Sequence, residues 1–288
     1  MSFSMANCAS CGIQLPTTSW GKADNLCVDC RRMAAQSFVL TPDGTVAPPP
    51  TRPVTRTSNL RLSVTTVLVG INVGVFVLMA LTGVSIVEPN TQQLVKWGAN
   101  TGPLSLGPQP WRILTSNYVH IGIIHIFFNM WCLLNLGALA ERVFDRWTYV
   151  LVYTASGLAG SLASLWWHPM VIGAGASGAI FGLAGALLAA LYLGKFPIPR
   201  AALRGTMKSL VMFAGYNLLF GLVPGIDNSA HIGGLLGGAA LGAFFSGHLT
   251  QPAEERQRWR TYATVGTGII FLIAFEMLKK QYALPPNR

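Results

Sequence analysis

Seven apolar stretches, most of them long enough to cross a lipid bilayer, recur along this chain. A span needs about 20 mostly apolar residues, with a range of about 17 to 25. The stretches lie at Leu62–Leu81, Tyr118–Leu139, Tyr149–Trp167, Ser177–Leu193, Ser209–Val223, Ala230–Phe245 and Tyr262–Leu278, of which the fifth and sixth are short. Only 10% of the residues are charged, against about a quarter in soluble domains. The pattern therefore predicts an all-α polytopic membrane protein.

Lysine and arginine gather beside alternate ends of these spans. The basic clusters are Arg52–Arg61, Arg142–Arg146, Lys195–Lys208 and Arg256–Arg260. Short cytoplasmic loops hold the excess of these residues, so the clusters predict a cytoplasmic N-terminus and an extracytoplasmic C-terminus. No early apolar segment resembles a cleavable signal peptide, and we expect the first span to direct insertion. We attribute the net charge of +10 to topology and lipid headgroups, and expect no nucleic-acid partner.

Four cysteines precede the first span as two C-x-x-C pairs, Cys8 with Cys11 and Cys27 with Cys30, 15 residues apart. This spacing lets two tight turns offer four thiolates to one tetrahedral zinc ion. A disulfide pair or redox thiols would use the same residues, but structural disulfides seldom persist in the reducing cytosol. We predict a small zinc-ribbon-like module with four cysteine ligands, whose folding depends on structural Zn²⁺, and which binds another protein or regulates the rest of the chain.

These features divide the chain into four parts. We expect the zinc module over residues 1–35, a Pro/Thr-rich linker over 36–58 and a transmembrane core over 59–248. Residues 249–288 would supply a cytosolic connector, a seventh transmembrane helix and a C-terminal tail. A cytosolic zinc module joined to such a core favours a prokaryotic plasma membrane as the location, and an internal eukaryotic membrane is the alternative.

Polar residues inside the spans are expected to carry function, because each is costly in hydrocarbon. The second span contains His120, His125 and Asn129. His125 and Asn129 are four residues apart and so share one helical face. The alternative is that they only hydrogen-bond neighbouring helices.

Ser177 begins the fourth span within "GAGASGAIFG", and His231 lies at the start of the sixth. Each is followed by a G-x-x-x-G pair, Gly178 with Gly182 and Gly234 with Gly238. Such pairs let helices pack at backbone contact, and both spans run in the same direction. Ser177 and His231 would then meet at one membrane level as a nucleophile and its general base.

The glycines around Ser177 have a second use. Gly175 and Gly178 remove side-chain bulk on either side of the hydroxyl, so a substrate backbone can approach it. A helix start also leaves amide N–H groups free to face a developing negative charge. His125 and Asn129 would add side-chain donors to the same oxyanion. Small residues also crowd transmembrane interfaces for packing alone, so "GASG" by itself does not establish catalysis.

Together these motifs resemble the rhomboid family of intramembrane serine proteases. The matching segments, in family order, are "WR" at Trp111, "HIGIIHIFFN" at His120, "GALAER" with Glu141, "GASG" at Ser177 and "AHIGGLLGG" at His231. The resemblance implies a six-helix catalytic core over 59–248, with a Ser177–His231 dyad and an oxyanion hole formed by the Ser177 N–H with His125 and Asn129. It also implies that Phe181 packs against the histidine, and that Trp111 and Arg112 anchor a long first loop.

The implied reaction is peptide-bond hydrolysis in or near a transmembrane helix of another membrane protein. Catalysis would need no cofactor, and no H-E-x-x-H metallopeptidase motif occurs in the chain. His120 would help bring water to the site. One alternative is a proteolytically inactive rhomboid-like protein that binds or chaperones membrane clients. Another is a transporter or channel, but the acidic residues fall in loops or near span ends.

Overall fold

The computed structural model describes Cys8 and residues 62–196, 199–223 and 225–283. Contacts within the chain divide it into Met1–Arg61 and Leu62–Arg288. Three of the predicted zinc ligands, Cys11, Cys27 and Cys30, lie outside the described residues, as does the linker. The following description concerns the second unit.

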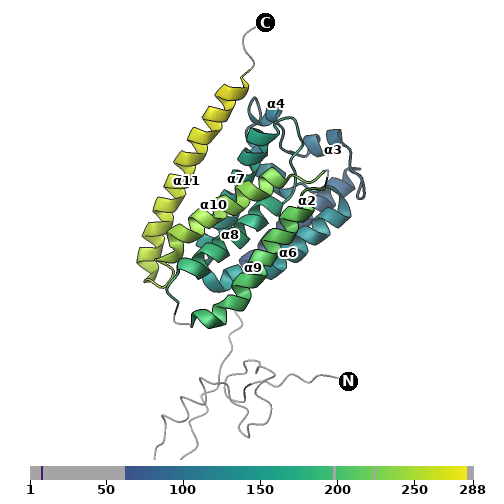
Figure 1. Ribbon diagram of the computed structural model, residues 1–288. Coiled ribbons are helices and arrows are strands. Elements are labelled where there is room, and N and C mark those ends of the chain that lie inside the picture. The colour runs from purple at the N-terminus through teal and green to yellow at the C-terminus, as the bar shows by residue number, and fades with distance from the viewer. Residues whose placement is uncertain (1–7, 9–61, 197–198, 224, 284–288) are drawn as a thin grey trace, which may run out of the picture. The chain divides into compact units, whose positions relative to one another are not determined.

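This unit is helical (Figure 1). Its long helices are α2 (Val64–Leu81), α6 (Gly122–Val143), α7 (Arg146–Trp167), α8 (Ser177–Leu193), α9 (Arg200–Phe220), α10 (Asn228–Ser246) and α11 (Ala253–Tyr282). Between α2 and α6 lie the short helices α3 (Thr91–Lys96), α4 (Gly102–Ser105) and α5 (Arg112–Thr115) and the 3-10 turn η2 (Ser116–Tyr118). In the described part of the chain, the only β-pairing is an isolated bridge between Asn100 and Gly173.

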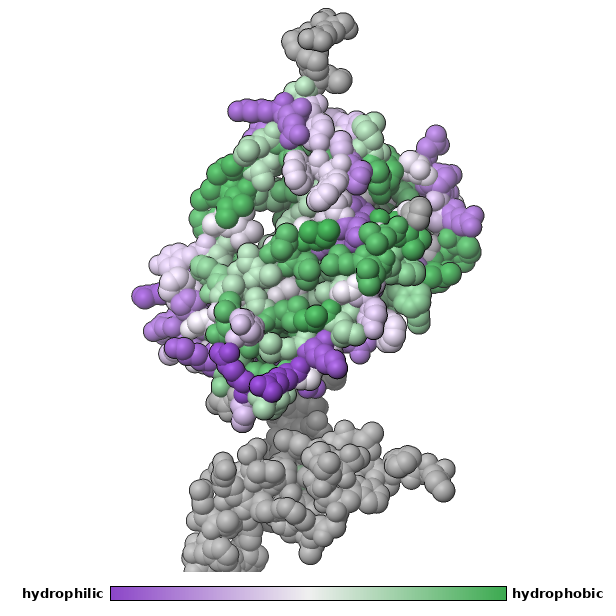
Figure 2. Space-filling view, in the orientation of Figure 1, coloured by the Kyte–Doolittle hydropathy of each residue, from purple (hydrophilic) through white to green (hydrophobic). Residues whose placement is uncertain are grey.

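The lengths and compositions of the helices fit a multi-pass membrane protein. Five described helices are long and apolar enough to cross a membrane, namely α2, α6, α7, α10 and α11, and α8 is a shorter apolar helix. Figure 2 shows apolar side chains across the middle of the visible face, with hydrophilic residues gathered toward its ends. In a bilayer these exposed apolar side chains would contact lipid and not water.

The helices agree with the predicted spans in place but not always in length. α8 has the predicted bounds, whereas α6 begins at Gly122 and not at Tyr118. Gly122 has a φ of +79°, and a side chain there would strike the carbonyl oxygen of Val87. A turn therefore precedes the helix. α9 and α11 start nine residues before the predicted spans, at Arg200 and Ala253. Their first turns carry charged side chains, which end an apolar run without ending a helix.

Close backbone contact joins α8 to α10, with α7 packed against both. A side chain at Gly234 would overlap the carbonyl group of Gly178, and one at Gly238 would overlap that of Gly182. The two predicted G-x-x-x-G pairs therefore face each other in parallel register. Residue size sets this arrangement, since only glycine lets backbones approach so closely.

The segment between α2 and α6 is ordered by a buried arginine. Arg112 is 4% exposed, and its Nη1 donates to the carbonyl oxygens of Val95 at 2.6 Å and Ala99 at 3.0 Å. Its guanidinium carbon lies 4.8 Å from the ring centroid of Trp111. These contacts tie α3 to α5, so the connection is a packed loop and not a further span.

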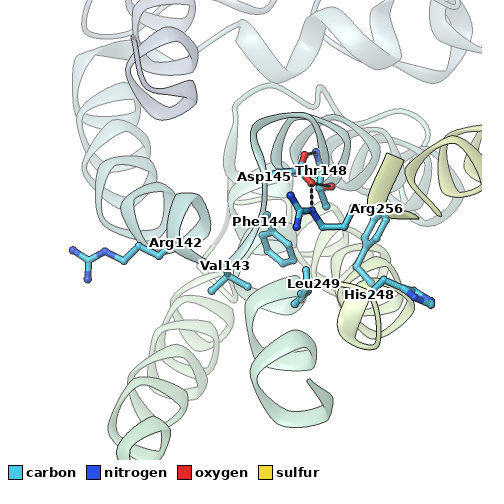
Figure 3. Close-up of a pocket in the computed structure, with 9 residues that line it drawn as sticks. Arg142, Val143, Phe144, Asp145, Thr148, His248, Leu249 and Arg256 are labelled. Carbon is cyan, nitrogen blue, oxygen red and sulfur yellow. Dashed lines mark hydrogen bonds and ion pairs between the residues drawn. The ribbon is translucent and has the colours of Figure 1, made fainter. Parts of the chain in front are cut away.

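Asp145 connects α7 and α11 at the end of the bundle opposite Ser177, which we call the basic end. Its carboxylate accepts hydrogen bonds from the first-turn amides of α7 and from Arg260 of α11, at 3.0 Å. Figure 3 shows Arg256 reaching the same carboxylate beside a cavity of about 230 Å³, while Arg142 points away. At the far end of α11, the hydroxyl of Tyr282 donates to the Trp166 carbonyl at 2.8 Å. Both ends of α11 are therefore attached to α7.

The glycine contact can be tested by substitution. We expect Gly238→Ala to destabilise the protein by about 1–3 kcal/mol, because the added methyl forces α10 away from α8. Gly266→Ala in α11 is the matched control, since nothing lies within 4 Å of the methyl it would add. Thermal unfolding in detergent micelles measures both variants. Equal melting temperatures for the two would contradict the close-contact argument.

Candidate active site

Ser177 and His231 lie side by side at one end of the bundle. Ser177 is the first residue of α8, and His231 lies in the first turn of α10. The Nε2 atom of His231 is 2.9 Å from the Oγ atom of Ser177. The parallel glycine contact between the two helices places these first turns at the same level. The structure thus brings together the two residues predicted as nucleophile and base.

The His231 ring is held on one face. It stacks on Phe181 with centroids 4.3 Å apart and an angle of 12° between the planes. Phe181 lies one turn after Ser177 on α8, as the sequence suggested. The Nδ1 atom of His231 is buried and has no hydrogen-bond partner among the described residues. Ring stacking and the position of α10 therefore orient the imidazole.

His125 lies against the loop that leads into α8. Its Nδ1 accepts a hydrogen bond from the Ile121 amide at 3.2 Å, so the neutral ring carries its proton on Nε2. Gly175, two residues before Ser177, has a φ of +124°, and a Cβ there would lie 2.9 Å from this Nε2. Glycine at this position therefore allows the N–H donor of His125 to approach the backbone beside the nucleophile.

Asn129 lies one turn further along α6. Its Nδ2 donates to the carbonyl oxygen of His125 at 2.9 Å, and its Oδ1 is buried without a partner in the part of the chain that is described. The donated bond stays within one helix and uses only one of the two amide hydrogens. The other hydrogen is available to an oxyanion.

His120 lies behind His125. It is fully buried, with its Nδ1 3.3 Å from the Tyr118 carbonyl oxygen and its ring centroid 5.3 Å from that of His125. It is not among the residues that line the cavity described next. Its contacts suit a supporting position behind the site more than direct contact with substrate.

A cavity of about 1070 Å³ contains Ser177 and His231 and continues between α6 and α9. Its walls there are mostly apolar, with Phe128 and Trp131 on α6 and Leu210 and Phe213 on α9. The cavity is large enough for an extended peptide segment. It also reaches the surface between two helices that would face lipid.

The other side of the cavity is polar, which the motifs in the sequence did not indicate. Asn100, Asn117, Ser161, Ser164 and Asp227 line it. They come from the segment before α6, from α7 and from the residue before α10. Asp227 could have been noticed, because it precedes His231 by four residues in "DNSAHIGG".

Comparison with known proteins places this arrangement in a family. A family model described as Rhomboid domain matches residues 107–248. Rhomboid protease AarA of Providencia stuartii is 30% identical over 203 residues, which cover 62% of this chain and 71% of that protein. Rhomboid protease GluP of Bacillus subtilis (strain 168) is 39% identical over 183 residues, covering 62% of this chain and 34% of that protein.

A plant relative is similar over a comparable length. RHOMBOID-like protein 6, mitochondrial, of Arabidopsis thaliana is 36% identical over 179 residues, covering 62% of this chain and 57% of that protein. The chain therefore spans about a third of the Bacillus relative and under three fifths of the plant one. The matched Rhomboid domain contains Ser177, His231 and both helices that carry them. This chain belongs to the rhomboid family.

Proposed function

We propose that this protein is an intramembrane serine endopeptidase that cleaves peptide bonds in or near transmembrane helices of other membrane proteins. The observation that carries the proposal is the 2.9 Å separation of Ser177 Oγ and His231 Nε2 inside a cavity that opens between α6 and α9. A serine and a histidine in this relation form an activated nucleophile and its base. Two of the relatives are named rhomboid proteases.

The reaction proceeds in two steps. His231 takes the Ser177 proton as Oγ attacks the scissile carbonyl carbon, and the resulting imidazolium protonates the leaving amine as the C–N bond breaks. Water then attacks the acyl-serine ester, losing a proton to His231, and the proton returns to Oγ as the carboxylic acid leaves. The Ser177 amide and the side chains of His125 and Asn129 stabilise the oxyanion in both steps.

The substrate enters sideways, between α6 and α9. A helical substrate must unwind to present its carbonyl to Ser177, because a helix encloses its own backbone. Residues that weaken helices, such as glycine and serine, favour that step, and alanine is small enough for close approach. We therefore propose substrates with small or helix-weakening residues near the cut.

A client-binding protein without proteolytic activity would have the same fold and cavity. It would not need Ser177 and His231 within hydrogen-bond distance, nor the His125 Nε2–H beside Gly175. These two features favour the protease. We propose a core of six helices with α11 as a seventh. The charge pattern that predicted orientation supports a cytoplasmic N-terminus and an extracytoplasmic C-terminus. The proposed zinc module is our reason for proposing a prokaryotic plasma membrane.

The dyad is tested by cleavage of a tagged single-span substrate in liposomes. We expect Ser177→Ala and His231→Ala each to lower kcat by at least about 10³-fold. Ser246→Ala is the matched control, because its hydroxyl bonds within α10, to the Ala243 carbonyl at 2.7 Å. Cleavage by the native chain and the control alone supports the dyad. Substrate binding without cleavage by all four proteins would instead favour the client-binding protein.

The oxyanion donors make a separate prediction. Removing one such donor from a hydrolase costs about 10²–10³ in kcat. We expect losses of this size for His125→Ala and Asn129→Ala, with KM changed less than about threefold, because the donors act mainly on the transition state. Initial rates over a range of substrate concentrations separate the two constants. A large rise in KM with kcat unchanged would assign these side chains to binding.

We propose further that Cys8, Cys11, Cys27 and Cys30 bind one structural zinc ion, and that the module contacts another protein. Their spacing supports this, since four thiolates complete a tetrahedral site. Metal analysis of the purified chain should give about one zinc per chain, falling to near zero in Cys27→Ser. Cys132→Ser should keep its zinc, because Cys132 lies on α6 within the membrane core. Equal zinc contents in the two variants would contradict the assignment.

A further inference from the structure

Asp227 carries a carboxylate that no cation pairs with among the described residues. It precedes α10 and lines the active-site cavity. Its Oδ2 accepts a hydrogen bond from the Ser164 hydroxyl at 2.5 Å. Its Oδ1 accepts bonds from the Ser229 hydroxyl at 2.5 Å and from the Ala230 amide at 3.1 Å. Three neutral donors therefore satisfy one charged group, which is the arrangement of a helix N-cap with two additional hydroxyl partners.

The hydrogen bond from Ser164 joins two helices. Ser164 lies near the end of α7 and is 2% exposed. One turn earlier on α7, a Cβ at Gly160 would lie 2.7 Å from the Ala230 carbonyl oxygen. A Cβ at Gly233 would likewise lie 2.9 Å from the Ala159 carbonyl oxygen. The start of α10 is thus held against α7 by one hydrogen bond and by close backbone contacts, all within four residues of His231.

His231 depends on this attachment more than a histidine in a triad would. In a triad a third group binds the second ring nitrogen and orients the base. Here Nδ1 of His231 has no partner in the described structure. Phe181 fixes the plane of the ring by stacking, but a stack permits sliding parallel to the plane. The position of the first turn of α10 must therefore determine how far Nε2 lies from Ser177 Oγ.

We propose that Asp227 is a positioning residue for the dyad and acts through its hydrogen bond to Ser164. The bond fixes the first turn of α10 against α7, and this keeps Nε2 of His231 within hydrogen-bond distance of Ser177. In a triad the third residue orients the histidine by direct contact. Asp227 would orient His231 by fixing the backbone that carries it. The inference rests on the proposed protease activity but concerns a different pair of residues.

Ser164→Ala tests the link between the helices while leaving the N-cap of α10 intact. Small displacements of catalytic groups can cost about 10²-fold in rate, and we expect kcat to fall about 10- to 100-fold. KM should stay within about twofold, because the groove between α6 and α9 is unchanged. The labelling rate of Ser177 by a fluorophosphonate should fall with kcat, while the melting temperature should match that of the Ser246→Ala control. Native kcat and labelling in a folded Ser164→Ala variant would overturn the proposal.

A double-mutant cycle identifies the path. If Asp227 acts through Ser164, Asp227→Ala with Ser164→Ala should be no slower than Asp227→Ala alone, because the bond is already lost. If the two substitutions lowered kcat independently, so that their effects multiplied in the double variant, the proposal would be overturned. The proposal would also be overturned if Asp227→Ala lost its activity while Ser164→Ala kept the native kcat.

Fluorophosphonate labelling separates failure of this proposal from failure of the protease proposal, since it requires no substrate helix. Labelling of the native chain that is slowed in Ser164→Ala supports positioning even if no substrate is cleaved. A native chain that neither labels nor cleaves would overturn both proposals, because no reactive serine would then be present to position.

Discussion

The close backbone contact between α8 and α10 is the interaction on which the rest of this structure depends. Gly178 faces Gly234, and Gly182 faces Gly238, in parallel register. In lipid there is no hydrophobic force to press helices together, so association relies on packing at short range. This contact sets the distance between the helices and their relative level. The first turns of the two helices, which carry the serine and the histidine, are then neighbours.

The remaining helices pack around α8 and α10 and provide hydrogen-bond partners for polar groups that would be costly in lipid. α7 covers the other side of α10 and supplies serine hydroxyls to the cavity, while Arg112 orders the loop before α6 by binding backbone carbonyls. Polar groups in a membrane protein are costly unless they are paired or face water. Here one group of them lines the cavity at one end of the bundle, and another is paired around Asp145 at the basic end. Apolar residues fill the core between the helices and also cover the outer faces and the groove between α6 and α9.

The cost of burying charge also bears on how His231 is held in place within a membrane. A buried carboxylate in direct contact with the histidine would need desolvation, which is expensive for a charge. Asp227 instead lies at the helix end, where three donors satisfy it. Its influence reaches His231 through backbone geometry. Phe181 supplies the remaining constraint without adding any polar group.

The sequence by itself determined the helical membrane class, the positions of the helices and the expectation that Ser177 meets His231, because apolar length, glycine spacing and a helix-start serine are local properties. It did not determine where the basic ends of α9 and α11 begin, since an arginine can end an apolar run and still continue a helix. Only the tertiary structure decided that Ser164 meets Asp227. It also decided that the Ile121 amide donates to Nδ1 of His125, which leaves the ring proton on Nε2. The Ser164–Asp227 contact joins residues 63 positions apart, and such pairing depends on helix packing, which no local pattern records.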